Sequence, residues 1–94
     1  PEQLFASGYS ACFAGAIGFV AGQKKIALNG VFVTAHVDIG LLDAGGLGLG
    51  AQLDVRLPGL DRSVAQEIVD AAHQVCPYSK ATRNNIDVKL NVVD

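Results

Sequence analysis

The two cysteines of this 94-residue chain are the residues best suited to chemistry. Cys12 lies in a segment of small residues with helical spacing, and Cys76 lies at the end of a second helical segment, just before Pro77. A thiol attacks as its thiolate, and burial in an apolar helix raises the thiol pKa unless a cation compensates. Glu2 is not on the same helix face as Cys12, but it could steer a cation at the mouth of the site. The pattern favours a catalytic dithiol.

A structural interpretation of the same cysteines stays open. Free cysteine is among the most buried residue types, so Cys12 could simply pack in the core. Cys76 ends a helix, where a resolving cysteine has room to move. A structural Cys12–Cys76 disulfide is a further possibility, and the chain-entropy model assigns its loop closure about 4 kcal/mol of stabilisation.

Other motifs are weaker candidates. The glycines of residues 46–50 are spaced like those of a phosphate-binding loop, but a strand follows them where a phosphate site needs a helix. His36 and His73 share no ligand spacing with either cysteine, so we expect no metal site.

Composition narrows the class of protein. Residues 1–94 are short enough for a single domain, and the net charge of −2 disfavours nucleic acid as a partner. No apolar run reaches the roughly 18 residues of a membrane span. Two cysteines without an export signal predict a cytoplasmic protein. The chain begins at Pro1 and contains no methionine, so we expect it to be a processed or truncated product.

Hydrophobic periodicity predicts an α+β fold with the order helix, strand, strand, helix, strand. The predicted helices cover residues 1–22, ending at Gly22, and a segment from Asp61 or Ser63 to Cys76, with Ser63 and Gln66 as a capping box. The predicted strands cover residues 31–39, 51–57 and 86–92, and the glycine-rich residues 40–50 form a loop or an irregular hairpin. Three strands leave open sheet edges.

The apolar residues of the helices predict which faces are buried. The first helix carries one regular face of Phe5, Tyr9, Cys12, Ala16 and Phe19, and its other faces are also apolar or small, which predicts a helix buried all round. The second carries a stripe of Val64, Ile68, Ala72 and Val75. Because half of all residues are hydrophobic, we expect a buried subunit interface.

Two segments carry a resemblance to a known family. Residues 1–13 read PEQLFASGYSACF and residues 75–88 read VCPYSKATRNNIDV. Both closely resemble the organic hydroperoxide resistance proteins, within the wider OsmC family, and residues 57–62, LPGLDR, fit as well. The resemblance extends over the whole chain.

The resemblance implies both a fold and a reaction. The fold would be an intertwined homodimer, with a long buried cysteine-bearing helix and a second helix on an antiparallel-rich sheet. Cys12 would be the peroxidatic nucleophile that reduces an organic hydroperoxide to an alcohol, and Cys76 would resolve the sulfenic acid as a disulfide. No cofactor is implied, since dihydrolipoyl groups on a partner protein would supply the reducing dithiol.

The resemblance also assigns supporting residues. Phe5, Tyr9 and Phe13 would line an apolar pocket for alkyl or fatty-acyl hydroperoxides. Glu2 would orient a catalytic arginine that belongs to an N-terminal β segment before Pro1. The chain's own arginines, Arg56, Arg62 and Arg83, do not match that motif. We therefore expect residues 1–94 alone to be a poor peroxidase and the intact parent protein a good one.

A second function remains compatible with the same fold. The chain could be a redox-sensing or binding module whose cysteines are structural or non-catalytic. Rapid loss of both thiols to one equivalent of hydroperoxide would distinguish the peroxidase from that module.

Overall fold

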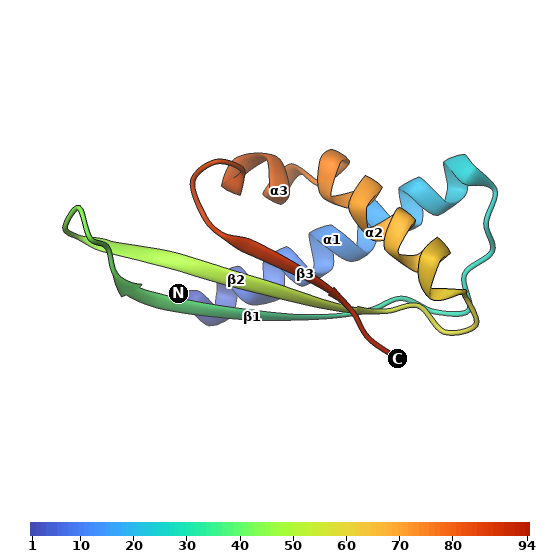
Figure 1. Cartoon of the computed structure of the whole chain (residues 1–94), viewed down its shortest axis with the longest axis horizontal. Coiled ribbons are helices and arrows are strands. Elements are labelled where there is room, and N and C mark those ends of the chain that lie inside the picture. The colour runs from blue at the N-terminus through green and yellow to red at the C-terminus, as the bar shows by residue number, and fades with distance from the viewer.

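The structure, a computed structural model, describes residues 1–94 as helices packed on one side of a small sheet (Figure 1). The elements in chain order are α1 (Glu2–Lys24), β1 (Phe32–Leu41), β2 (Leu47–Arg56), α2 (Arg62–Val75), α3 (Pro77–Thr82) and β3 (Val88–Val92). The molecule is elongated, at 45 × 21 × 21 Å. The expected α+β fold is confirmed, with α3 as an additional element.

The sheet is mixed, with the strand order β1-β2-β3. Strand β1 pairs with β2 in the antiparallel sense, whereas β2 and β3 are parallel and are joined through α2 and α3. The glycine-rich segment forms a hairpin, in which Gly45 and Gly46 adopt positive φ angles of 96° and 81°. The tip of this hairpin projects beyond the helices (Figure 1).

Strand β2 forms the floor of the core. Its alternate residues Ala51, Leu53 and Val55 are buried, while Gln52 and Asp54 between them are partly exposed on the open side of the sheet. This pattern confirms the predicted alternation, because successive side chains of a strand point to opposite faces. The core residues of the helices complete the cluster: Tyr9, Phe13, Ile17, Ile68, Val69 and Ala72.

Helix α1 continues two residues past the predicted end at Gly22. Lys25 adopts the left-handed conformation with φ 56° and donates its backbone N–H to Gly22, while the N–H of Ile26 bonds to the Ala21 carbonyl at 2.9 Å. These two bonds satisfy carbonyls that the helix end would otherwise leave unpaired. A lysine therefore takes the position that the sequence pattern assigned to a glycine.

The buried face of α1 differs from the predicted one. The helix buries Tyr9, Phe13, Ala16, Ile17, Val20 and Ala21, whereas Phe19 is 57% exposed and Cys12 lies at the border. The expectation of a helix buried on all sides was therefore wrong for this chain.

The apolar composition of α1 has a second consequence. By length and composition the helix could cross a membrane, with a mean hydropathy of 1.6, so the expectation that no segment reaches this limit was wrong. Its buried residues pack against the sheet and α2. This core packing accounts for the apolar character of α1.

Helix α2 begins after Asp61, one of the two predicted starts, but it is capped and packed differently from the prediction. Its N-cap is Asp61, and no side-chain hydrogen bond caps this end, so the expected capping box is absent. The buried stripe is Ala65, Ile68, Val69 and Ala72. It keeps Ile68 and Ala72 of the predicted stripe, whereas Val64 is half-buried and Val75 is 38% exposed. Pro77 occupies the first position of α3, where its fixed φ suits a helix start.

We predict that Leu53→Ala lowers the free energy of unfolding by about 2–5 kcal/mol, because it opens a cavity beneath the helices. Leu53 has no exposed surface, whereas Leu47 on the same strand is 71% exposed. Leu47→Ala is therefore the matched control and should change the value by less than about 0.5 kcal/mol. Urea denaturation measures both, and equal losses would contradict the assigned core.

Candidate active site

The structure brings the two cysteines into contact. Both are free thiols, and the Cys76 S–H points at the Cys12 sulfur with the two Sγ atoms 3.5 Å apart. They belong to different elements, since Cys12 lies midway along α1 and Cys76 joins α2 to α3. The two residues that the sequence singled out therefore form one site.

Cys76 occupies the corner between two helices. Its backbone is extended, with φ −64° and ψ 124°, between the end of α2 and the start of α3. Its N–H bonds to the Ala72 carbonyl at 2.8 Å, and its own carbonyl accepts from Lys80 at 3.0 Å. The side chain has no exposed surface. Cys76 already faces Cys12, so the travel expected of a resolving cysteine is short.

The surroundings of Cys12 disfavour its thiolate. Burial raises the pKa of the Cys12 thiol, and the neighbouring Cys76 thiol raises it as well. A backbone hydrogen bond from Tyr78 partly opposes this shift. No arginine or lysine contributes to the pKa, although a cation is what a buried nucleophilic thiol requires.

The arginines of the chain are engaged elsewhere. Arg56 lies over the ring of Phe32, 4.2 Å from its centroid, and Arg62 donates a hydrogen bond to the carbonyl oxygen of Val92 at the end of β3. Arg83 donates to the carbonyl oxygen of His73 at 2.6 Å. Glu2 lies in the first turn of α1, half-buried, and no arginine side chain of the chain pairs with it.

An apolar hollow opens beside Cys12. Its volume is about 330 Å³, and six residues line it: Cys12, Gly15, Ala16, Phe19, Val75 and Pro77. The sequence analysis placed Phe19 on the Cys12 face of the helix, but it did not assign Val75 and Pro77 to a pocket. Their positions directly before and after Cys76 were the one sequence signal that they could line a pocket at the thiols.

The aromatic residues expected to line a substrate pocket lie outside the hollow beside Cys12. Phe5, Tyr9 and Tyr78 form a cluster with ring centroids 5.7–6.1 Å apart, and Tyr78 packs closely on the backbone of Gly8. Tyr9 and Phe13 have no exposed surface, and Phe5 is half-buried. None of the three expected residues lines the hollow, so their role in substrate binding stays a prediction.

A buried polar network lies behind the cysteines. The hydroxyl of Tyr9 is 2.7 Å from Ser79 Oγ and 3.3 Å from Thr82 Oγ1. His73 Nδ1, near the end of α2, lies 2.8 Å from the same Ser79 Oγ. The sequence did not predict that Ser79 and Thr82 bond to Tyr9. The one signal for them was their spacing, since Ser79 and Thr82 lie three and six residues after Cys76.

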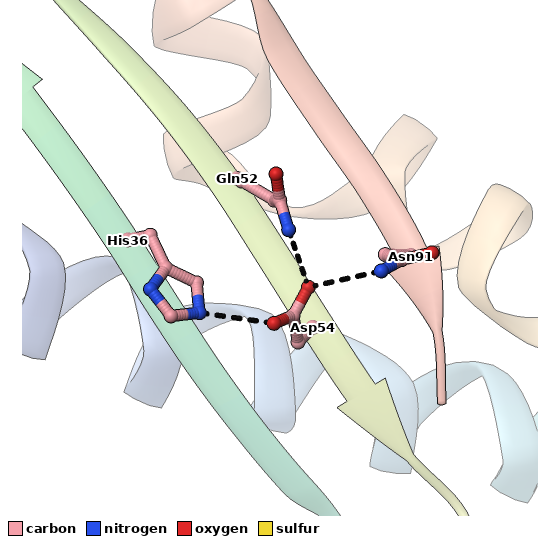
Figure 2. Close-up of polar contacts among 4 residues, drawn as sticks. All are labelled: His36, Gln52, Asp54 and Asn91. Carbon is pink, nitrogen blue, oxygen red and sulfur yellow. Dashed lines mark hydrogen bonds and ion pairs between the residues drawn. The ribbon is translucent and has the colours of Figure 1, made fainter. Parts of the chain in front are cut away.

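A second polar cluster lies on the open side of the sheet, away from the helices (Figure 2). The carboxylate of Asp54 accepts hydrogen bonds from Gln52 at 2.9 Å, from His36 at 2.9 Å and from Asn91 at 3.4 Å. The Gln52 bond is the largest of the contributions that lower the Asp54 pKa. These bonds join all three strands, and no group of three or more His, Cys, Asp or Glu side chains could hold a metal ion.

We predict that stability falls as the pH drops through about 6.5, the ordinary histidine pKa, because burial and the nearby Arg83 lower the pKa of His73. The unfolded chain then binds a proton that the folded chain rejects, so the neutral form stabilises the fold above this pH. The nearby Asp70 carboxylate opposes the shift. Urea titrations between about pH 5 and pH 7 should show a weaker pH dependence for His73→Gln. The same pH dependence of stability in His73→Gln and the wild type would contradict the assignment of this dependence to His73.

The sequence and the fold of the chain are similar to those of known proteins. A family model described as OsmC-like protein matches residues 1–91. The chain is 53% identical over 93 residues to an organic hydroperoxide resistance protein of Xanthomonas axonopodis pv. citri, covering 98% of the chain and 65% of the relative. It is 48% identical over 93 residues to OhrB of Bacillus subtilis, covering 98% of the chain and 68% of that protein.

The crystal structure of Bacillus subtilis OhrB superimposes on the chain with a TM-score of 0.95, covering 99% of this chain and 69% of that one. The α+β arrangement is thus that of a solved organic hydroperoxide resistance protein. The chain spans about two-thirds of the length of the relatives that it matches.

Proposed function

Because the chain belongs to the organic hydroperoxide resistance proteins of the OsmC-like family, we propose that it carries the thiol pair of an organic hydroperoxide reductase. One observation supports this most directly. Two free thiols from segments far apart in the sequence lie 3.5 Å from each other, beside an apolar hollow. A packed structural pair does not require such a hollow.

The proposed reaction has two steps. The Cys12 thiolate attacks an oxygen of the O–O bond, the alcohol leaves after taking up a proton, and Cys12 becomes a sulfenic acid. The Cys76 thiol then attacks this sulfur, so that a disulfide forms and the hydroxyl leaves as water. The two thiols together supply the two electrons that reduce the hydroperoxide.

Activation of Cys12 requires a cation that residues 1–94 do not place beside it. Burial raises the pKa of this thiol, which leaves little thiolate at neutral pH. We propose that a part of the whole protein outside these residues supplies an arginine, which Glu2 at the start of α1 orients. An arginine held by a carboxylate would lower the Cys12 pKa and stabilise the negative charge that the reaction moves onto oxygen.

The hollow beside Cys12 suits the apolar part of the substrate. Phe19, Val75 and Pro77 offer it hydrocarbon surface, and hydrogen peroxide would gain nothing from such contacts. The half-buried Phe5 could extend this surface on the other side of the thiol, supported from the core by Tyr9 and Phe13. An alkyl or fatty-acyl hydroperoxide is therefore the proposed substrate class.

The reducing partner and the assembly are part of the same proposal. Cys12 is the more exposed of the two sulfur-bearing residues, so an external dithiol, such as a dihydrolipoyl group on a partner protein, would attack there. A homodimer is supported by large apolar residues left exposed, among them Leu4 and Leu42, and by the unpaired outer edge of β1. Free thiols are compatible with the cytoplasm.

We predict that Cys12→Ser abolishes the consumption of cumene hydroperoxide by the intact protein, because it removes the nucleophile. Cys76→Ser should still consume one equivalent, after which the unresolved sulfenic acid oxidises further to the sulfinic acid. Mass spectrometry of the intact chain separates these products from the disulfide.

A Ser10→Ala variant is the control, since Ser10 bonds only to the Ser7 carbonyl within α1. Retention of activity by both cysteine variants would refute the dithiol mechanism. A thiol pair that reacts slowly or is already bonded would instead favour a sensing or binding module.

A further inference from the structure

Two connections run side by side between α1 and the Cys76 corner. One is the contact between the Cys12 and Cys76 sulfurs, at 3.5 Å. The other is the hydrogen bond between the Tyr9 hydroxyl and Ser79 Oγ, at 2.7 Å. Tyr9 lies three residues before Cys12 and Ser79 three residues after Cys76, so each pair occupies neighbouring turns of the same segments.

The hydrogen bond is built into the core. Tyr9 and Ser79 both have no exposed surface, and Thr82 is only 3% exposed. Water cannot replace a partner that is lost at such a site, so a buried hydroxyl without its bond is costly. All buried side-chain polar atoms of the chain have partners. The Tyr9–Ser79 bond therefore resists a displacement of α3 away from α1.

Two further bonds cross the corner itself. His73 Nδ1 and Ser79 Oγ, on either side of Cys76, are 2.8 Å apart. Arg83, just after α3, donates to the carbonyl oxygen of His73 at 2.6 Å. Opening of the angle between α2 and α3 would break both bonds. The corner that carries Cys76 is thus fixed from α2 as well as from α1.

We propose that Tyr9, Ser79 and His73 are positioning residues for disulfide closure, and that they hold the Cys76 sulfur within reach of Cys12 until the bond forms. The inference rests on the proposed thiol chemistry but adds residues to it. A disulfide needs its sulfurs about 2.0 Å apart, so closure from the observed distance is a small movement. None of the three side chains forms a hydrogen bond with either cysteine sulfur.

The benefit is kinetic. A Cys12 sulfenic acid has two fates, because it condenses with Cys76 and loses water, or a second hydroperoxide oxidises it to the sulfinic acid. Closure requires the Cys76 sulfur to be in place during the lifetime of the sulfenic acid. A corner held by buried hydrogen bonds keeps the sulfur there, whereas a loosened corner would leave Cys12 open to over-oxidation.

The test measures closure without a hydroperoxide. One equivalent of dithiobis-nitrobenzoate modifies Cys12, the more exposed thiol, and releases one coloured thionitrobenzoate. Cys76 then attacks the Cys12 mixed disulfide, so that the Cys12–Cys76 bond forms and the second thionitrobenzoate leaves with a proton lost from Cys76. The rate of this second release does not depend on the reagent concentration and reports closure alone.

We predict that Ser79→Ala and Tyr9→Phe each slow the second release by at least about five-fold, the usual effect of one hydrogen bond. Ser79→Ala also removes the bond to His73, and Tyr9→Phe also removes the bond to Thr82. The double variant should be slowed by less than the product of the two single effects, because both changes remove the Tyr9–Ser79 bond. Ser79→Thr keeps a hydroxyl and should restore much of the rate. Tyr9→Phe preserves the aromatic ring, so the core remains filled.

Ser10→Ala is the matched control, since its hydroxyl bonds only within α1 and its loss should not change closure. Equal second-release rates in the wild type, Ser79→Ala and Tyr9→Phe would overturn the positioning role. Failure of the wild-type protein to react with cumene hydroperoxide would refute the proposed function instead. The closure assay would still report on the positioning residues in that case.

Discussion

The packing of α1 against both the sheet and α2 is the constraint on which the site depends. Buried residues of α1 meet the floor formed by Leu53 and Val55, and Ile68 of α2 completes the same cluster. This packing fixes the rotation of α1 about its axis, which places Cys12 at the border of the core rather than inside it. The same packing sets how closely the Cys76 corner approaches. The sulfur–sulfur contact is therefore a result of core geometry.

Burial and reactivity make opposite demands at this site. An enclosed Cys76 cannot drift away, but the same enclosure raises the pKa of Cys12 and disfavours its reactive form. The two demands are compatible if the core fixes the positions of the two sulfurs and a separate cation at the mouth of the site stabilises the Cys12 thiolate. Residues 1–94 provide the first part of this arrangement. The polar network behind the thiols adds order without adding charge next to sulfur, because its contacts to Tyr9 come from the hydroxyls of Ser79 and Thr82.

The sequence predicted what depends on local periodicity and missed what depends on distant partners. The alternation of apolar and polar residues predicted both β2 and its buried side, because Leu53 and Val55 point to the same face of the strand whatever packs on that face. The capping box at Ser63 failed because Asp61 takes the N-cap position of α2. Pro77 was expected to end a helix, yet it begins α3, since a proline suits both positions. The cysteine pair could be predicted from residue type alone. The bond between Tyr9 and Ser79 joins positions 70 residues apart, so no local sequence pattern predicts it.

The parallel pairing of β2 with β3 has a consequence for the order of folding. The β1–β2 hairpin joins neighbouring parts of the chain and closes over a short turn, so it can form early. Strand β3 can pair with β2 only after the chain has passed through α2 and α3, which is a slower, non-local step. The corner that holds Cys76 belongs to this late crossover. The contact between the two sulfurs therefore depends on this non-local crossover as well as on α1.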